Sequence, residues 1–447
     1  MIDMSVIMLI IIQSILLGTA VYFLIRKPFD IGTIMVILFV VFYAFPAWDL
    51  YFGAYLFSDV IVNYRVNIMN KNEIIYLIFV TTLVMISFYL GYLITIYIPK
   101  KPNYEINKNE INTKKYRYIR KTVLLIWMVV FAYSFSRYNQ SFFLFFTPSR
   151  KEGVFQSTYI ASLYKLLPTT YFILQIIKDF YEQSRIKRKT LALVIFPFLA
   201  YMTTGQRREI INFFILVATI LIHVKVKGRN SSESNKVNSI KYKRRKIFQL
   251  GFISTLLIPV LWWGRVVFSQ LQRNSNNIIM PWHRRGFLEL LFGSSSGGFK
   301  TLLLGLEHKD IFEVPWGYNI YFFIFSFIPR EIMSSKPLVI NRLWQIDFGL
   351  SGNPSTFYIN EMYINFGITS IIISLLFGIA LSFAFNKLYV SNRLIYNIYS
   401  FIIFSNVITL FKNGFIQFII SVLMAIIIIG IPSTLIMNKT KKSVVEP

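Results

Sequence analysis

Long apolar runs separated by short polar stretches dominate the hydrophobic pattern of the chain. A helix that crosses the hydrocarbon core of a membrane needs about 20 predominantly apolar residues. Windows of this kind predict eleven transmembrane helices, at 4–25, 31–51, 73–98, 122–137, 158–177, 190–204, 210–226, 248–270, 363–385, 394–411 and 415–437. The windows 122–137 and 190–204 are short. The first window has neither a basic segment before it nor a small-residue cleavage site after it, which favours a retained helix over a signal peptide.

Composition supports the same class of protein. Of the 447 residues, 55% are hydrophobic and 44 are Phe, which is typical of a polytopic membrane protein with an all-α fold. The chain has no Cys, which excludes disulfides, thiolate metal ligands and a cysteine nucleophile.

The charge of the chain is strongly positive, with 47 Lys and Arg against 20 Asp and Glu. Alternate loops carry 29 of these 47 cations, and Lys and Arg concentrate on the cytoplasmic side of membrane proteins. We therefore expect the N-terminus outside and the C-terminus inside. The excess of positive charge is then explained by contact of the cytoplasmic loops with anionic lipid headgroups, so nucleic acid is not expected as a partner.

The windows divide the chain into three regions. We predict a transmembrane bundle over 1–264 with most of helices 1 to 8, a large extracytoplasmic loop over 265–362, and helices 9 to 11 over 363–447. Within the loop, the stretches LELLFGSSSGGFKTLLLGL and YNIYFFIFSFIP are too short to span. They predict short amphipathic or re-entrant helices.

Cations also occur on the predicted outer face, where they are normally scarce. They lie in the stretches TTGQRRE, LWWGRVVF, MPWHRRGF and FIPREIMSSKPLVINRLW: Arg207, Arg208, Arg265, His283, Arg284, Arg285, Arg330, Lys336 and Arg342. Each alone is explained as a headgroup contact or a snorkelling side chain. Together they form a cluster of one sign, which indicates a functional site. The arginine fork binds phosphate oxygens in pairs, so we predict a phosphate or diphosphate site.

Acidic and aromatic residues limit the chemistry of this site. The outer acids show no DxD or HExxH spacing, so a metal ion is not expected. Five of the seven Trp lie in or beside the outer loop: Trp262, Trp263, Trp282, Trp316 and Trp344. They fit an interfacial belt of aromatic residues as well as sugar stacking, and composition does not separate the two.

The stretch FIPREIMSSKPLVINRLW, followed by GLSGNPSTFYINEMYINFG, resembles the Wzy-type oligosaccharide repeat unit polymerases of O-antigen and capsule assembly. TTGQRRE and WWGRVVF are similar to two further features of that family. The resemblance implies a C-type glycosyltransferase architecture in a bacterial inner (plasma) membrane, with its active site on the periplasmic or extracellular face. It also implies cooperation with a chain-length regulator and a flippase, and no cofactor.

The implied activity moves a growing glycan from undecaprenyl diphosphate to the non-reducing end of a lipid-linked repeat unit, without a metal. By position, the resemblance carries over to one set of residues: Arg207, Arg208, Arg265, Arg330, Lys336, Arg342, Asn353, Glu361 and Asn365. His283 is the candidate for a loop histidine that the related O-antigen ligases use.

A mechanism follows as a hypothesis. The cations, with Arg284 and Arg285 among them, would stabilise the departing diphosphate, while Asn353 and Asn365 would position the substrate. One group would accept the proton of the attacking hydroxyl, in the order of preference Glu361, His283 and Asp347. The alternative role of Glu361 is pairing with the dipole at a helix N-terminus.

Two other functions remain open. An O-antigen-ligase-like transferase would share nearly every feature above. A transporter or flippase for lipid-linked oligosaccharides would instead predict internal repeats and charged or broken helices near the membrane midplane. In this chain the charges lie at the ends of the spans.

Overall fold

The computed structural model describes residues 4–26, 30–52, 71–95, 111–138, 145–146, 158–183, 186–204, 207–229, 299, 302–303, 315–328, 332–340, 343, 346, 357–389, 391 and 394–437. These residues are almost entirely helical. The described part of the chain contains no β-strand, and its extended pairing is a single antiparallel bridge between Ile111 and Met437.

Within the described ranges, eight helical segments are long and apolar enough to cross a membrane: Met4–Ile25, Ile31–Phe52, Lys71–Ile94, Thr113–Ser136, Tyr159–Glu182, Tyr358–Tyr389, Leu394–Asn413 and Phe415–Leu435. They coincide with eight of the eleven predicted windows. The prediction of an all-α multi-pass membrane protein is thereby confirmed.

The other three windows differ from one another. Window 190–204 contains two short helices, α8 (Arg188–Ala192) and α9 (Ile195–Thr203). Window 210–226 lies within helix α10 (Arg207–Arg229), and window 248–270 lies outside the described residues. The total of eleven spans, the three predicted regions and the C-type architecture stay predictions.

The chain divides into two compact units, of which the first comprises Met1–Lys100, Arg284–Asn386 and Asn406–Ser421. Its elements are α1 (Met4–Arg26), α2 (Ile31–Phe39), η1 (Val40–Ala44), α3 (Phe45–Phe52), α4 (Lys71–Ile94), α14 (Tyr318–Ser326), α16 (Tyr358–Phe366), η6 (Gly367–Thr369), most of α17 (Ser370–Tyr389), α19 (Val407–Asn413) and the start of α20 (Phe415–Ala425). Helix α2 packs against α1, α4 and α19, and α16 packs against α4 and α19. The stretch YNIYFFIFSFIP contains α14, a helix of 9 residues, and its amphipathic or re-entrant placement stays a prediction.

Polar side chains inside this unit pair with one another. Gln13 of α1 accepts a hydrogen bond from Trp48 Nε1 of α3 at 2.7 Å and donates one to Thr82 Oγ1 of α4 at 2.9 Å. Within lipid the hydrophobic effect does not drive helices together, so hydrogen bonds between helices supplement van der Waals packing. This network therefore joins three helices of the unit.

Two glycines bring the backbones of α4 and α17 into direct contact. A Cβ atom on Gly91 would overlap the carbonyl oxygen of Leu375, and one on Gly378 would overlap the carbonyl oxygen of Phe88. Small residues at a helix crossing allow this close approach in membrane proteins. The overlap involves backbone on both sides, so side-chain movement cannot relieve it.

We expect Gly378→Ala to destabilise the protein by about 1–3 kcal/mol, because the added methyl group forces the two helices apart. Gly18→Ala is the control, since Gly18 lies within α1 and no atom of the described residues is within 4 Å of its added Cβ. That change should be neutral or stabilising, by up to about 1 kcal/mol, because alanine favours the helix. Thermal unfolding in detergent measures both variants, and equal melting temperatures would contradict the proposed crossing.

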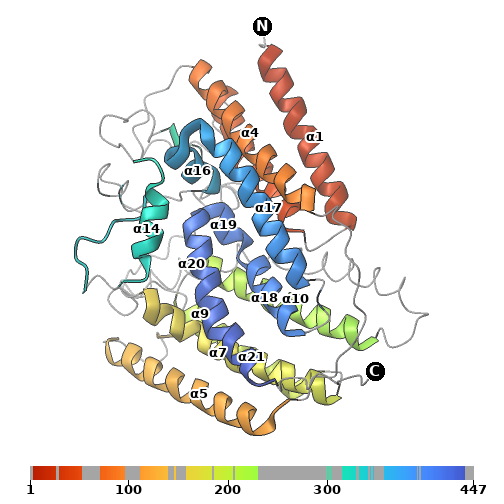
Figure 1. The fold of residues 1–447 in the computed structure, drawn as a ribbon, viewed down its shortest axis with the longest axis vertical. Helices are drawn as coiled ribbons and strands as arrows, with labels where there is room; N and C mark the ends of the chain where they lie inside the picture. The colour runs from red at the N-terminus through yellow and green to blue at the C-terminus, as the bar shows by residue number, and fades with distance from the viewer. Residues whose placement is uncertain are drawn as a thin grey trace, which may run out of the picture. The chain divides into compact units, whose positions relative to one another are not determined.

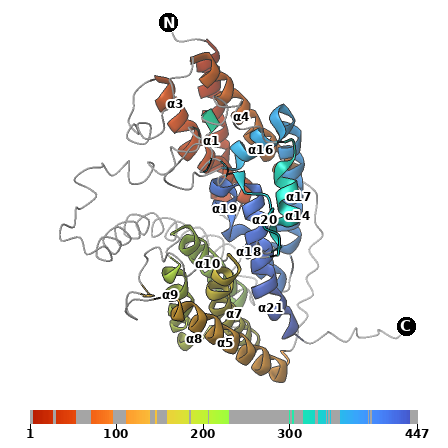
Figure 2. The same cartoon turned by 90° about the vertical axis from the view of Figure 1, so that its left-hand side faces the viewer.

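The second unit comprises Lys101–His283, Lys387–Ser405 and Val422–Pro447. Its elements are α5 (Thr113–Ser136), α7 (Thr158–Gln183), α8, α9, α10, α18 (Leu394–Ser405), the end of α20, η7 (Ile426–Gly430) and α21 (Ile431–Leu435). Helix α5 lies along α7, as Figures 1 and 2 both show. Helix α7 also packs against α9 and η7, and α10 against α18.

A buried carboxylate of α7 in this unit, Asp179, contacts the start of α8. Its side chain has 0% exposure. It accepts hydrogen bonds from Lys187 N at 3.0 Å, Thr190 Oγ1 at 2.5 Å and Gln175 Nε2 at 3.0 Å. All three partners are donors, so Asp179 has a structural role as the acceptor for the start of α8.

Candidate functional site

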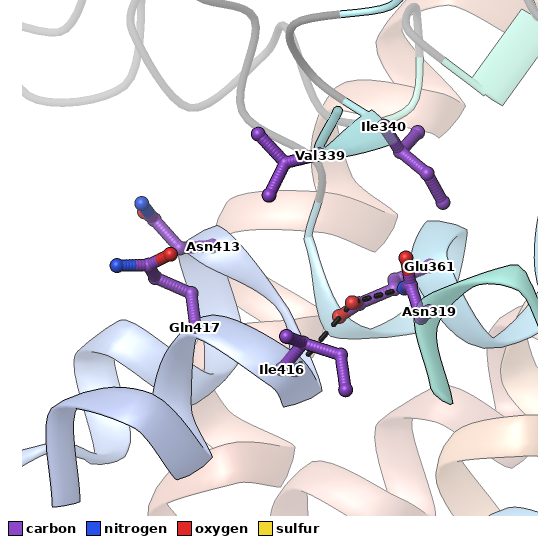
Figure 3. Close-up of a pocket in the computed structure, with 7 residues that line it drawn as sticks. All are labelled: Asn319, Val339, Ile340, Glu361, Asn413, Ile416 and Gln417. Atoms are coloured by element: carbon purple, nitrogen blue, oxygen red, sulfur yellow. Dashed lines mark hydrogen bonds between the residues drawn. The ribbon is translucent and has the colours of Figure 1, made fainter. Parts of the chain in front are cut away.

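Glu361 is a buried carboxylate at the meeting point of three helices of the first unit. It lies in the first turn of α16 and is 6% exposed. Its Oε1 accepts hydrogen bonds from Asn319 Nδ2 of α14 and, at 3.4 Å, from Ile416 N of α20, while its Oε2 accepts one from Phe415 N. Figure 3 shows the Glu361 and Asn319 side chains directed toward each other beside α20.

The backbone around Gly414 makes this arrangement possible. Gly414 separates α19 from α20 and has φ +88°, in the left-handed region that glycine adopts without steric cost. A Cβ atom at this position would overlap the Glu361 carboxylate. The first N–H groups of a helix lack partners within the helix. Glu361 therefore caps the N-terminus of α20, in addition to its place in the first turn of α16.

Asn365 lies one turn after Glu361 and holds the start of α14. Its Oδ1 accepts a hydrogen bond from Asn319 N at 3.0 Å, and its backbone carbonyl accepts one from Gly317 N at 3.1 Å. Its Nδ2 donates to the Glu361 carbonyl at 2.6 Å. The predicted substrate-positioning residue thus binds protein groups, and through Asn319 it helps to place the group that contacts the carboxylate.

Hydrogen-bond donors surround the Glu361 carboxyl group. Every described partner of Glu361 is a donor, and hydrogen bonds from donors stabilise the ionised carboxylate. No Lys or Arg pairs with it among the described residues. Since burial of a charge without hydrogen bonds is costly, the three donors and the positive end of α20 are what stabilise this carboxylate.

A pocket opens beside this carboxylate. It is lined by Asn319, Val339, Ile340, Glu361, Asn413, Ile416 and Gln417. Its cavity volume is about 20 Å³, which is room for roughly one water molecule. In Figure 3 the Asn413 and Gln417 amides lie on one side, the Glu361–Asn319 pair on the other, and Val339 and Ile340 across from α20. The pocket therefore admits one hydroxyl-sized group at a time.

Lys336, a predicted diphosphate ligand, contacts backbone carbonyls at the end of α14. Its Nζ donates to Ser326 O at 2.7 Å and to Ile328 O at 2.9 Å. A cation at this position is stabilised by the negative end of the helix. The contacts therefore give Lys336 a capping role, and its role toward a diphosphate stays a prediction.

The arginine pair of TTGQRRE begins α10 in the second unit. Arg207 is the first residue of the helix, and its side chain lies outside the described part. Arg208 is partly buried, and its Nε has no hydrogen-bond partner among the described residues. The adjacent Glu209 pairs with Lys165 of α7, and both side chains are largely buried, with exposures of 15% and 12%.

The remaining predicted site residues lie outside the described residues: Arg265, His283, Arg284, Arg285, Arg330, Arg342, Asp347 and Asn353. Their convergence with Arg208 stays a prediction. Of the five outer Trp, the structure describes Trp316, which is 69% exposed and packs edge-on against Phe366 with ring centroids 5.4 Å apart.

Several residues of the site were missed by sequence reasoning. Asn319, Asn413 and Gln417 line the pocket but lie in stretches that look like ordinary span ends or loop. The dipeptide Asn413–Gly414 is a turn signal and could have shown the break between the last two helices. Nothing in the local sequence around Asn319 indicates a carboxylate 42 residues away.

Fold and site together define a multi-pass α-helical membrane protein with a buried, hydrogen-bonded carboxylate beside a small polar pocket. Comparisons of the chain with protein-family models, with curated proteins and with solved structures find no match.

Proposed function

We propose that the chain is a metal-independent glycosyltransferase that polymerises lipid-linked oligosaccharides. It would transfer a growing glycan from undecaprenyl diphosphate to the non-reducing end of a lipid-linked repeat unit at the outer face of a bacterial plasma membrane. The proposal rests on the resemblance of its late motifs to the repeat unit polymerases, together with one feature of the site.

That feature is the Glu361 carboxylate at the edge of the pocket. A buried acid inside a membrane protein is costly and indicates function. A carboxylate offers about four acceptor positions, and three donors among the described residues occupy part of this capacity. A hydroxyl in the pocket could use the remainder, and its proton would then lie within reach of the carboxylate.

The proposed step is a displacement at the anomeric carbon of the donor glycan. A hydroxyl oxygen of the acceptor sugar forms a bond to that carbon, and its proton passes to Glu361. The bond from the anomeric carbon to the diphosphate oxygen breaks, and undecaprenyl diphosphate departs with the electron pair. Cations near that oxygen would stabilise the charge that develops on it.

Arg208 is a candidate for binding the diphosphate. Its partly buried Nε has no partner among the described residues, and a buried unsatisfied donor costs about 1–3 kcal/mol. A phosphate oxygen would satisfy this donor through a charge-assisted hydrogen bond. The neighbouring Glu209 pairs with Lys165 through Oε1, and its Oε2 has no hydrogen-bond partner among the described residues.

Reconstitution tests the proposed activity. The purified protein in liposomes receives lipid-linked repeat units extracted from cells that carry its gene, and the products are resolved on a gel. A ladder of elongated glycans is the expected result. Transfer only to a different added acceptor would identify a ligase instead, and movement of intact substrate across the bilayer without transfer would identify a flippase.

In the same assay we expect Arg208→Gln to lower the rate by roughly a hundredfold, the usual cost of removing one charge-stabilising donor. Arg137→Gln is the control, because Arg137 is an exposed arginine that lies over the ring of Tyr133 at 4.7 Å. Its rate should stay within about twofold of the unmodified protein, as is usual for surface changes. Similar losses in both variants would count against a specific role for Arg208.

A further inference from the structure

Two amide side chains line the pocket on the side opposite the carboxylate, and neither belongs to the predicted site. Asn413 is the last residue of α19, and Gln417 lies in the first turn of α20. Both are half-buried and line the pocket. Figure 3 shows the two side chains beside each other, on the side opposite Glu361 and Asn319.

The break at Gly414 explains how these two amides come together. The left-handed backbone of Gly414 ends α19 and lets α20 begin at the next residue. Lys412 is fixed at the same turn, because its carbonyl accepts a hydrogen bond from Phe357 N at 3.1 Å. The turn that directs two N–H groups to Glu361 thus also presents both amides to the same pocket.

The chemistry of the lining selects one class of ligand. An amide side chain both donates and accepts hydrogen bonds, as a hydroxyl does, whereas the ionised carboxylate only accepts. Among the described residues that line the pocket there is one acid and no Lys or Arg, which favours an uncharged ligand over a phosphate. Val339, Ile340 and Ile416 supply aliphatic surface that suits the C–H edge of a sugar ring.

We infer that Asn413 and Gln417 are positioning residues that bind one hydroxyl group of the acceptor sugar and turn it toward Glu361. This inference rests on the proposed function and deepens it. The cavity holds one hydroxyl-sized group, so only an edge of the terminal sugar enters. The pocket is therefore an acceptor subsite for an uncharged, polyhydroxylated sugar, and the diphosphate binds elsewhere.

The first test compares the KM for the acceptor with the KM for the donor. Gln417→Met keeps the length of the side chain and removes its hydrogen-bonding groups. We expect the KM for the acceptor to rise about tenfold, from the loss of one to two hydrogen bonds, while the KM for the donor stays unchanged. Asn413→Ser is the second variant and should raise the acceptor KM by less, because serine retains one hydroxyl. Parallel changes in both KM values and in melting temperature would indicate a purely structural role and overturn the inference.

A binding measurement tests the same inference without turnover. The probes are the neutral repeat-unit oligosaccharide, released from the extracted lipid, and inorganic pyrophosphate, with calorimetry as the readout. Weaker oligosaccharide binding to Gln417→Met, with pyrophosphate binding unchanged, is the expected result. If the protein shows no polymerisation yet gives this pattern, the proposed reaction fails while the sugar subsite stands. Equal oligosaccharide binding by the variant and the unmodified protein overturns the subsite.

Discussion

Replacing Glu361 by glutamine is expected to lower the rate of glycan transfer by about a hundredfold or more, the usual contribution of a general base. The amide cannot take the proton of the acceptor hydroxyl. Its one remaining oxygen can keep the Oε1 contacts with Asn319 Nδ2 and Ile416 N, while its NH₂ group then lies against the N–H group of Phe415. We expect the protein to fold with reduced stability. Rates at saturating donor and acceptor, measured on the reconstituted protein, check this prediction.

Asp179→Asn is the matched control for this variant. Asp179 is also buried and also accepts hydrogen bonds from three donors, but no pocket among those described includes it. Both substitutions place an NH₂ group against a donor and should cost similar stability, about 1–3 kcal/mol. Only Glu361→Gln should abolish turnover. Near-normal turnover of Glu361→Gln would remove this residue as the base and leave it with the capping role alone.

Gly414→Ala is expected to be among the most destabilising single changes in the first unit. Gly414 has φ +88° and ψ 178°, a conformation that is essentially restricted to glycine, and an L-residue there costs about 1–3 kcal/mol. The added Cβ atom would also overlap the Glu361 carboxylate, for which overpacking adds about 1–3 kcal/mol. Thermal unfolding in detergent gives the loss of stability, and the transfer assay gives the accompanying loss of rate.

Gly317→Ala separates these two contributions. Gly317 also has a positive φ, +74°, but no atom of the described residues lies within 4 Å of its added Cβ. The Gly317→Ala variant should lose only the stability that the backbone conformation costs, and its transfer rate should stay unchanged. If the two alanine variants prove equally stable, the close contact between Gly414 and Glu361 is not present in the folded protein.

The transmembrane pattern was largely predictable from the sequence, because hydropathy and the alternation of basic loops depend on neighbouring residues. Eight windows coincide with helices of spanning length. The helix expected to start at 363 begins at Tyr358, since TFYINEMYINFG has no helix-breaking residue before Gly367. Glu361 and Asn365 thus belong to a helix, which places them more rigidly than a loop would.

The candidate site was predictable only in part. Glu361 and Asn365 were predicted because the motif that resembles the repeat unit polymerases, E-x-Y-x-N-F-G, carries over to them by position. Lys336 was assigned to phosphate from its charge, whereas its two carbonyl contacts depend on where α14 ends. The pocket residues Asn413 and Gln417 depend on the pairing of α16 with α20, and such long-range contacts leave no local signal.

The capping contact of Glu361 has a consequence for the order in which the protein assembles. Glu361 is synthesised 54 residues before Phe415, whose N–H group it accepts. Until that part of the chain enters the membrane, the carboxylate lacks its α20 donors, and an acidic residue in a helix entering the bilayer costs about 2.5–3.5 kcal/mol. We therefore expect α16 to reach its final position only after α19 and α20 have entered the membrane and α20 has supplied these donors. A chain that ends before residue 414 should be recognised by membrane quality control as unfinished.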